Sequence, residues 1–154
     1  PNRRAFDDAL VRETERARRY GRPLSLAMFD IDRLGQLNAA FGHDMGDDTI
    51  ARFATVLTDT CRLTDLVART GGAEFACLMP DTTSQAASTL AERVRKALMQ
   101  AEMPGGLTCS VGVAGWRDVE DPESLVARAG AALYRSKHQG RDRISVAGDD
   151  ALAA

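Results

Sequence analysis

The stretch Leu66-Val67-Ala68-Arg69-Thr70-Gly71-Gly72-Ala73-Glu74-Phe75-Ala76-Cys77-Leu78-Met79 joins two apolar runs through a glycine pair, and Pro80-Asp81 ends the second run. This pattern predicts a tight β-hairpin, because glycine reaches positive φ without a steric penalty at Cβ. Near the turn lies one acidic residue, Glu74, beside the small Ala73. Glycine-pair turns are common and most are structural, so the turn alone says little about function.

The composition is that of one globular domain. The chain has 154 residues, 44% hydrophobic and 27% charged, and is long enough to bury a substantial core. Its net charge of −2 argues against a nucleic-acid-binding face. The three cysteines, Cys61, Cys77 and Cys109, lack CxxC spacing, and their odd number rules out a fully paired set within one chain. Because Cys77 and Cys109 fall in apolar runs, we expect small core residues in a reducing compartment. We therefore expect a cytoplasmic domain, whose parent protein could still be anchored in a membrane.

Hydrophobic periodicity and turn residues predict an alternating order of elements. The expected helices span about 2–20, 34–41, 47–62, 83–101 and 121–138, and the expected strands span 24–29, 66–68, 75–79, 107–116 and 143–146. The order α-β-α-α-β-β-α-β-α-β, with no internal repeat or linker, predicts a single α/β sandwich with a mixed sheet. We expect residues 1–148 to be one domain of a longer protein and residues 149–154 to be a disordered tail.

Two carboxylates follow the first apolar strand. Because side chains alternate along a strand, Asp30 and Asp32 should project to one side and Ile31 to the other. Such a pair can hold a hard divalent cation, or it can cap the helix that follows. The residues alone leave both interpretations open.

Short motifs along the whole chain make it resemble a GGDEF domain, the diguanylate cyclase domain of bacterial signalling proteins. The matching stretches are Asn2–Phe6, Phe29–Asp32, Asn38, Phe41–His43, Gly46–Asp47, Asp65–Arg69, Gly71–Phe75, Ser110–Ala114, Ala132–Lys137 and Gly140–Arg141. The resemblance implies a palm-like nucleotide-cyclase sandwich, with a central mixed and mainly antiparallel sheet flanked by helices. In active members, two such domains meet face to face, each with one GTP, and make cyclic di-GMP with divalent metal ions.

The resemblance also implies roles for particular residues. Asp30 and the backbone carbonyl of Ile31 match the metal ligands, which would bind Mg²⁺. The substrate-binding positions are matched by Asn38 and Asp47 for the guanine and by Lys137 and Arg141 for the triphosphate. An Asp carboxylate can accept hydrogen bonds from the ring N–H and amino group of guanine.

Two positions depart from the family pattern. Ala73 stands where the family has a carboxylate that completes the metal site, and its neighbour Glu74, a remnant of the signature, projects to the opposite face of an extended chain. Gly35 stands where the family usually has a lysine that neutralises phosphate charge. A single engineered substitution would explain Ala73 but not Gly35. The two losses together favour a naturally degenerate domain in which Mg²⁺ binding is weak or absent.

A second ligand site of the family is matched in full. Arg62-Leu63-Thr64-Asp65 is separated from Gly71 by five residues. The family carries its RxxD inhibitory site for cyclic di-GMP at this offset. Arg93 matches a further arginine of that site, and Arg16 matches a secondary contact. The alternative interpretation is a surface ion pair between Arg62 and Asp65, which contributes little to stability.

Three functions follow from these matches. The leading hypothesis is a regulatory module that binds cyclic di-GMP at the RxxD site or GTP at the old active site. The second is a diguanylate cyclase with residual activity. The third is a scaffold that binds no nucleotide and forms a homodimer or docks a partner, including other domains of the parent chain.

Overall fold

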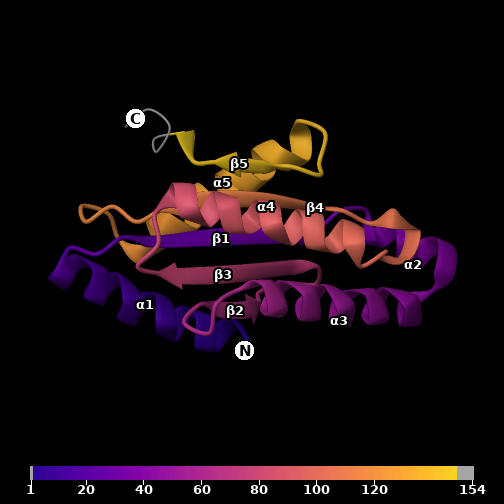
Figure 1. Ribbon diagram of the computed structural model, residues 1–154, viewed down its shortest axis with the longest axis horizontal. Coiled ribbons are helices and arrows are strands. Elements are labelled where there is room, and N and C mark those ends of the chain that lie inside the picture. The colour runs from indigo at the N-terminus through magenta and orange to yellow at the C-terminus, as the bar shows by residue number, and fades with distance from the viewer. Residues whose placement is uncertain (1, 149–154) are drawn as a thin grey trace.

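The computed structural model describes residues 2–148, which form a five-stranded sheet covered by helices (Figure 1). In chain order the elements are α1 (Arg3–Tyr20), β1 (Leu24–Ile31), α2 (Leu34–Phe41), α3 (His43–Thr60), β2 (Leu66–Arg69), β3 (Glu74–Pro80), α4 (Ser84–Gln100), the 3₁₀ turn η1 (Pro104–Gly106), β4 (Cys109–Gly115), α5 (Pro122–His138) and β5 (Ile144–Val146). The strand order is β2-β3-β1-β4-β5, antiparallel throughout except for β4 and β5. The predicted mixed, mainly antiparallel sandwich is confirmed. The tail expected over 149–154 lies outside the described residues.

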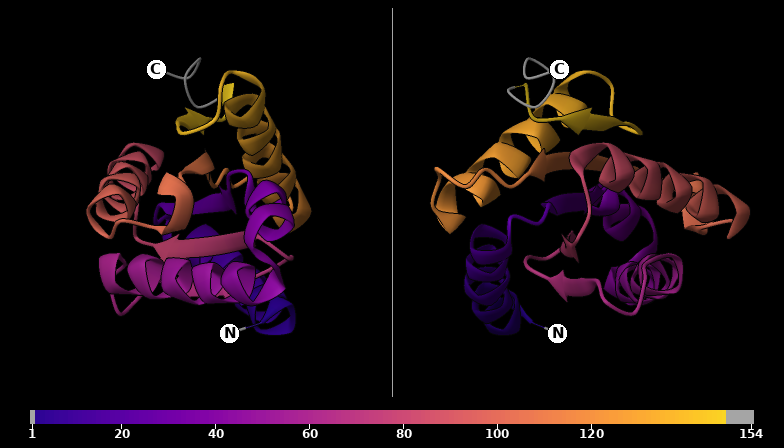
Figure 2. Two further views of the ribbon diagram at one scale, coloured as in Figure 1. Left: turned by 90° about the vertical axis from the view of Figure 1, so that its right-hand side faces the viewer. Right: turned by 60° about the vertical axis from the view of Figure 1, so that its left-hand side comes forward.

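Helices cover both faces of the sheet (Figure 2). On one face Phe29 of β1 packs with Phe53 of α3, and residues of α2 and α4 complete this half of the core. On the other face Leu26 of β1 packs among residues of α1 and α5, including Leu10 and Leu125. This double coverage explains why β1 reads as a nearly continuous apolar run. Among residues 2–148, no helix combines the length and the apolar character needed to span a lipid bilayer.

Most helix ends lie close to their predicted positions. Asn2 caps α1 by accepting a hydrogen bond from the backbone N–H of Ala5 at 3.0 Å, and Asp121 caps α5 in the same way through Ser124. Helix α3 is the exception, because it begins at His43 rather than near Asp47. Gly42, with φ of 89°, is the whole connection between α2 and α3, so the chain re-enters a helix at once.

The hairpin prediction is confirmed, but the reason given for it is wrong. Strands β2 and β3 pair from Arg69↔Phe75 onward, and residues 70–73 connect them. Neither Gly71 nor Gly72 has a positive φ. Instead, the Arg69 guanidinium closes the connection by donating from Nε and Nη2 to the carbonyl oxygen of Gly72, at 3.1 and 2.7 Å. The loop shape therefore depends on a side chain rather than on left-handed glycine.

Helix α5 lies directly on β4 because Gly112 has no side chain. A Cβ atom at Gly112 would lie 2.2 Å from both the carbonyl oxygen of Ala129 and the backbone nitrogen of Leu133. Only glycine permits this approach of the two backbones. The close packing fixes the end of α5, and with it Lys137, beside the C-terminal end of β1.

Candidate functional site

The C-terminal end of β1 carries an ion pair. The ammonium group of Lys137, from α5, contacts the Asp30 carboxylate directly, and the Asp30 side chain is 16% exposed. The ladder pairs Asp30 with Glu74 of β3, so both side chains project to the face covered by α1 and α5. The Glu74 carboxylate accepts a hydrogen bond from Thr70 Oγ1 at 3.2 Å. The negative charge of Asp30 is thus already matched by a cation of the protein.

Ala73 directly precedes Glu74 and lies beside this pair. Its carbonyl oxygen accepts a hydrogen bond from the backbone N–H of Ile31 at 3.1 Å, and its methyl group packs against the core that includes Phe75. No side-chain ligand is therefore available at this position. Mg²⁺ in nucleotide sites uses one or two carboxylates together with phosphate oxygens and water. Asp30, the Ile31 carbonyl and Glu74 fit at most one such ion.

Asp32 does not cap the helix that follows it. It is buried, and its carboxylate accepts hydrogen bonds from Thr108 Oγ1 at 2.7 Å, Ser110 Oγ at 2.6 Å and the backbone N–H of Asp142 at 3.0 Å. The N-cap of α2 is Arg33, which makes no side-chain capping bond. Asp32 therefore joins β4 and the loop after α5 to the end of β1. This structural use was not predicted, because its partners lie more than 70 residues away along the chain.

The two candidate triphosphate residues come from different elements. Lys137 is on α5, whereas Arg141 lies beyond the end of α5, in a loop where its φ is 63°. The backbone N–H of Arg141 donates to the carbonyl oxygen of Ser136 at 2.9 Å. Because Asp32 holds the next residue of this loop, Lys137 and Arg141 both lie near the end of β1.

The candidate guanine-binding residues lie on α2 and α3. Asn38 packs against Gly46, where an added Cβ would lie 1.7 Å from Asn38 Oδ1, and this buried oxygen has no hydrogen-bond partner. The next residue, Asp47, lines a cleft of about 320 Å³ between α3 and the hairpin. Arg69 of β2 lines the same cleft, and sequence reasoning assigned it no role. The position of Arg69 directly before the hairpin turn was the only feature of the sequence that could have indicated such a role.

The RxxD residues lie at the opposite end of β3, next to Pro80. The Arg62 guanidinium donates to Asp65 Oδ1 at 3.2 Å, to the carbonyl oxygen of Pro80 at 3.2 Å and to Thr82 Oγ1 at 2.5 Å. The Asp65 side chain is fully buried, and its other oxygen accepts from the backbone N–H of Arg62 at 2.9 Å. Asp65 therefore holds Arg62 in one orientation.

A cleft of about 190 Å³ opens beside this pair. It is lined by Arg62, Met79, Asp81, Thr82, Ala86, Thr89, Leu90 and Arg93. Arg93 of α4 is exposed, and among residues 2–148 its side chain makes no hydrogen bond or ion pair. The structure thus brings the RxxD loop and Arg93 to one cleft, as the sequence motifs suggested. Its walls combine two guanidinium groups and one carboxylate, that of Asp81, with hydroxyl and apolar side chains.

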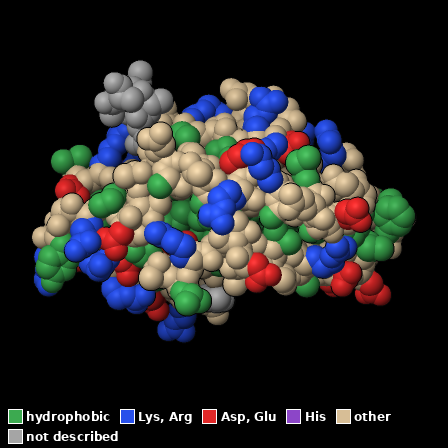
Figure 3. Space-filling model, viewed as in Figure 1, with side chains coloured by type: hydrophobic (Ala, Val, Ile, Leu, Met, Phe, Trp, Pro, Cys, Tyr) green, Lys and Arg blue, Asp and Glu red, His purple; other side chains and the backbone are tan. Residues whose placement is uncertain are grey.

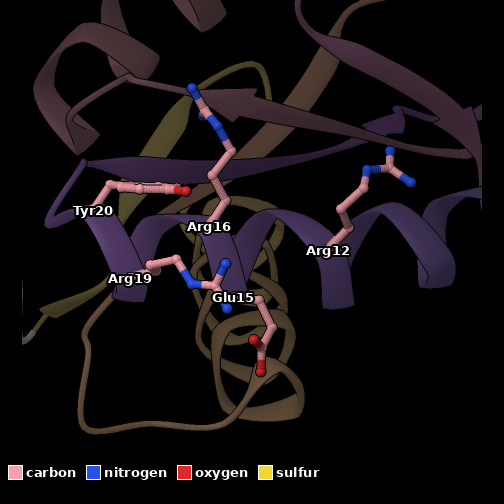
Figure 4. A pocket seen from close by; sticks show the side chains of 5 residues that line it. All are labelled: Arg12, Glu15, Arg16, Arg19 and Tyr20. Atoms are coloured by element: carbon pink, nitrogen blue, oxygen red, sulfur yellow. The ribbon is translucent and has the colours of Figure 1, made fainter.

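Arg16 approaches the same cleft from α1. Its guanidinium lies 3.5 Å from Asp81, which Arg22 also contacts at 3.3 Å. Figure 3 shows basic side chains gathered over α1, which carries several arginines. A hollow of about 180 Å³ on this helix is lined by Arg12, Glu15, Arg16, Arg19 and Tyr20. In Figure 4 Arg16 reaches toward the strands, whereas Glu15 points away from them.

Comparisons with known proteins agree with this geometry. The family model described as diguanylate cyclase, GGDEF domain, matches residues 1–143. Diguanylate cyclase DgcP of Pseudomonas aeruginosa is 40% identical over 152 residues, which cover 96% of this chain and 23% of that protein. The response regulator PleD of Caulobacter vibrioides is 35% identical over 151 residues, covering 93% of this chain and 33% of that protein. This chain therefore spans about a quarter to a third of the length of these two relatives.

Solved structures extend the comparison to the fold. The GGDEF domain of DgcB from Caulobacter crescentus, solved in complex with c-di-GMP, matches with a TM-score of 0.91 and 35% identity, covering 96% of this chain and 91% of that one. Diguanylate cyclase SiaD of Pseudomonas aeruginosa, solved with its activator SiaC, matches with a TM-score of 0.90 and 39% identity, covering 96% and 58%. This chain belongs to the GGDEF diguanylate cyclase domain family.

Proposed function

We propose that this domain is a regulatory module that binds cyclic di-GMP in the cleft between the RxxD loop and α4, and that it lacks ordinary cyclase activity. The observation that carries the proposal is the convergence of Arg62 and Arg93 on one cleft. The DgcB domain, a structural neighbour, was solved with c-di-GMP. This cleft and the altered signature lie at opposite ends of β3.

The chemistry of the cleft suits this ligand. Cyclic di-GMP is a dianion that carries two guanines, and the O6 and N7 atoms of guanine accept two parallel hydrogen bonds from a guanidinium. Arg62 is held ready by Asp65, so less of its conformational freedom is lost on binding. The exposed Arg93 adds positive charge that no acidic group of the described chain neutralises. In this arrangement Asp65 acts as a positioning residue for Arg62.

The signature end of the sheet supports the loss of cyclase activity. A methyl group stands at position 73, and Gly35 offers no cation for the phosphates. Losing one positioned acid–base group typically lowers a rate by roughly 10²–10⁴-fold. Product formation from GTP and Mg²⁺ at about 1 s⁻¹ or faster would overturn this part of the proposal.

A second candidate function is GTP binding at the old active site. The cleft lined by Asp47 and Arg69 favours it, because a carboxylate suited to guanine lies beside a guanidinium suited to phosphate. Glu74, which faces Asp30, supports weak binding of one Mg²⁺ with the nucleotide. Residual cyclase activity is favoured by the retained residues Asp30, Asn38, Asp47, Glu74, Lys137 and Arg141. If the domain binds neither nucleotide, its function would be that of a scaffold, which forms a homodimer or docks onto other domains of the parent protein.

Isothermal titration calorimetry with cyclic di-GMP tests the proposal. We expect Arg62→Ala to abolish binding, Arg62→Lys to weaken it severely and Arg93→Ala to weaken it by at least about tenfold without changing stability. Lys96→Ala is the matched control for Arg93, because it removes an exposed cation of α4 that lies outside the cleft. Asp47→Ala should leave cyclic di-GMP binding unchanged and weaken GTP.

Two results would contradict the proposal. If binding survives Arg62→Ala, the ligand sits elsewhere on the domain. If the unmutated domain shows no binding up to about 100 µM, a limit near −5.5 kcal/mol, the scaffold function takes the lead.

A further inference from the structure

Two cysteines and an aspartate meet beside the RxxD loop. Cys61 follows the end of α3, Cys77 lies in the middle of β3, and their Sγ atoms are 3.4 Å apart. With a carboxylate oxygen of Asp65, the three candidate ligand atoms lie within 4.8 Å of one another. Residues 16 apart along the chain are thus brought together by the packing of α3 against the hairpin.

We propose that Cys61, Cys77 and Asp65 form a binding site for one thiophilic divalent cation of the zinc type. In a tetrahedral zinc site, bonds of about 2.3 Å to sulfur and 2.0–2.2 Å to oxygen place two sulfurs about 3.8 Å apart. The observed 3.4 Å differs from that value by a few tenths of an ångström. A disulfide would require about 2.05 Å, a much larger movement of the two thiols. Solvent supplies the fourth ligand, because Cys61 is only half-buried.

The charges around the site are balanced when the cation is bound. Two thiolates and one carboxylate bring three negative charges, which exceed those of a divalent ion by one. The Arg62 guanidinium, 3.2 Å from Asp65 Oδ1, compensates the remaining charge. Without a cation, the hydrogen bond with Cys61 and burial raise the pKa of Cys77, which favours its neutral thiol. Because a cation binds thiolates, its binding releases thiol protons to solvent.

The ligand types set this site apart from the end of β1. Thiolates favour Zn²⁺ and related soft ions, whereas the oxygen atoms around Asp30 favour Mg²⁺. Cys109 supplies a control within the same chain, because it is buried in β4 and does not belong to the cluster. The site does not depend on nucleotide binding, so it can be tested on its own.

Titration of the reduced, metal-free protein with Cd²⁺ tests the proposal, since Cd²⁺ bound to thiolates gives an ultraviolet charge-transfer band. We expect the band to saturate at one equivalent in the unmutated protein and in Cys109→Ser. Cys61→Ser and Cys77→Ser should lose it. Asp65→Asn should keep the band but bind at least about tenfold more weakly.

The folding of each variant must also be measured, because Cys77 is fully buried and Cys77→Ser could fail to fold. Cys61 is half-buried at a helix end, so Cys61→Ser should give the native circular dichroism spectrum. We expect Zn²⁺ to raise the melting temperature of the unmutated protein and of Cys109→Ser, but not of Cys61→Ser. A saturable band in folded Cys61→Ser equal to that of the unmutated protein would overturn the proposal. So would the absence of saturable Cd²⁺ binding in the unmutated protein.

Discussion

Replacing Gly46 by alanine should separate the stability of the domain from guanine recognition. The three nearest atoms to an added Cβ all belong to the side chain of Asn38, the closest at 1.7 Å, so the amide must move away. Gly46 lies within α3, where alanine is favoured over glycine by up to about 1 kcal/mol. The displaced Oδ1 has no hydrogen-bond partner to lose. We therefore expect the free energy of unfolding to stay the same or rise by about 1 kcal/mol.

GTP binding should respond in the opposite direction. If Asn38 contacts the base, its displacement removes one hydrogen bond of about 1 kcal/mol and weakens GTP by roughly fivefold, with no effect on ATP. Urea denaturation and calorimetry measure the two quantities on the same samples. Asn38→Ala is the control, and the double variant should bind GTP no more weakly than either single one. Additive losses, or destabilisation of Gly46→Ala by more than about 2 kcal/mol, would refute the reasoning.

Three further predictions concern other parts of the domain. Gly112→Ala should lower the free energy of unfolding by about 2 kcal/mol or more, measured in urea, because its Cβ meets the backbone of α5 at 2.2 Å. Asp32→Ala should lower the free energy of unfolding by a similar amount, about 2 kcal/mol, because three donors lose one buried acceptor. If Asp32 served only as a metal ligand, the free energy of unfolding of the metal-free protein would change little. Gly35→Lys together with Ala73→Asp should restore conversion of GTP to cyclic di-GMP, and each change alone should restore it at most partly. A Cβ atom added at Gly35 meets no atom within 4 Å, so failure of the double variant would count against a simple loss of two groups.

Local signals predicted the fold well. The caps at Asn2 and Asp121 and the breaks at Gly21 and Gly140 depend on neighbouring residues, and such rules can be read from one sequence. The start of α3 was misplaced because Gly42 alone makes the α2–α3 connection, which composition does not reveal. The hairpin was predicted from its glycines, although the Arg69 side chain closes the loop.

The candidate sites were predicted through the family resemblance, and their contacts were not. The RxxD motif was recognised by its offset from the hairpin turn, and the short strand β2 accounts for that offset. In the structure this motif lies at the cleft that Arg62 and Arg93 line. The contact of Lys137 with Asp30 joins residues far apart in the chain, and hydrophobic periodicity carries no information on such pairs. The cluster of Cys61 and Cys77 was missed for the same reason.

Asp65 belongs to both proposed sites, so the two ligands should be coupled. A cation bound by Asp65 shares the carboxylate that orients Arg62, so the guanidinium stays close enough to balance the charge but shifts from the position in which it would contact guanine. Where one divalent ion replaces two thiol protons, the net charge of the cluster stays at −1, so the coupling acts through the position of Arg62. We expect saturating Cd²⁺ to weaken cyclic di-GMP by about tenfold, and cyclic di-GMP to weaken Cd²⁺ by the same factor. Calorimetry measures both, and Cys61→Ser should show no effect of Cd²⁺ on the nucleotide. If a protein that binds both ligands shows equal affinity for cyclic di-GMP with and without Cd²⁺, Asp65 does not hold Arg62 for the ligand.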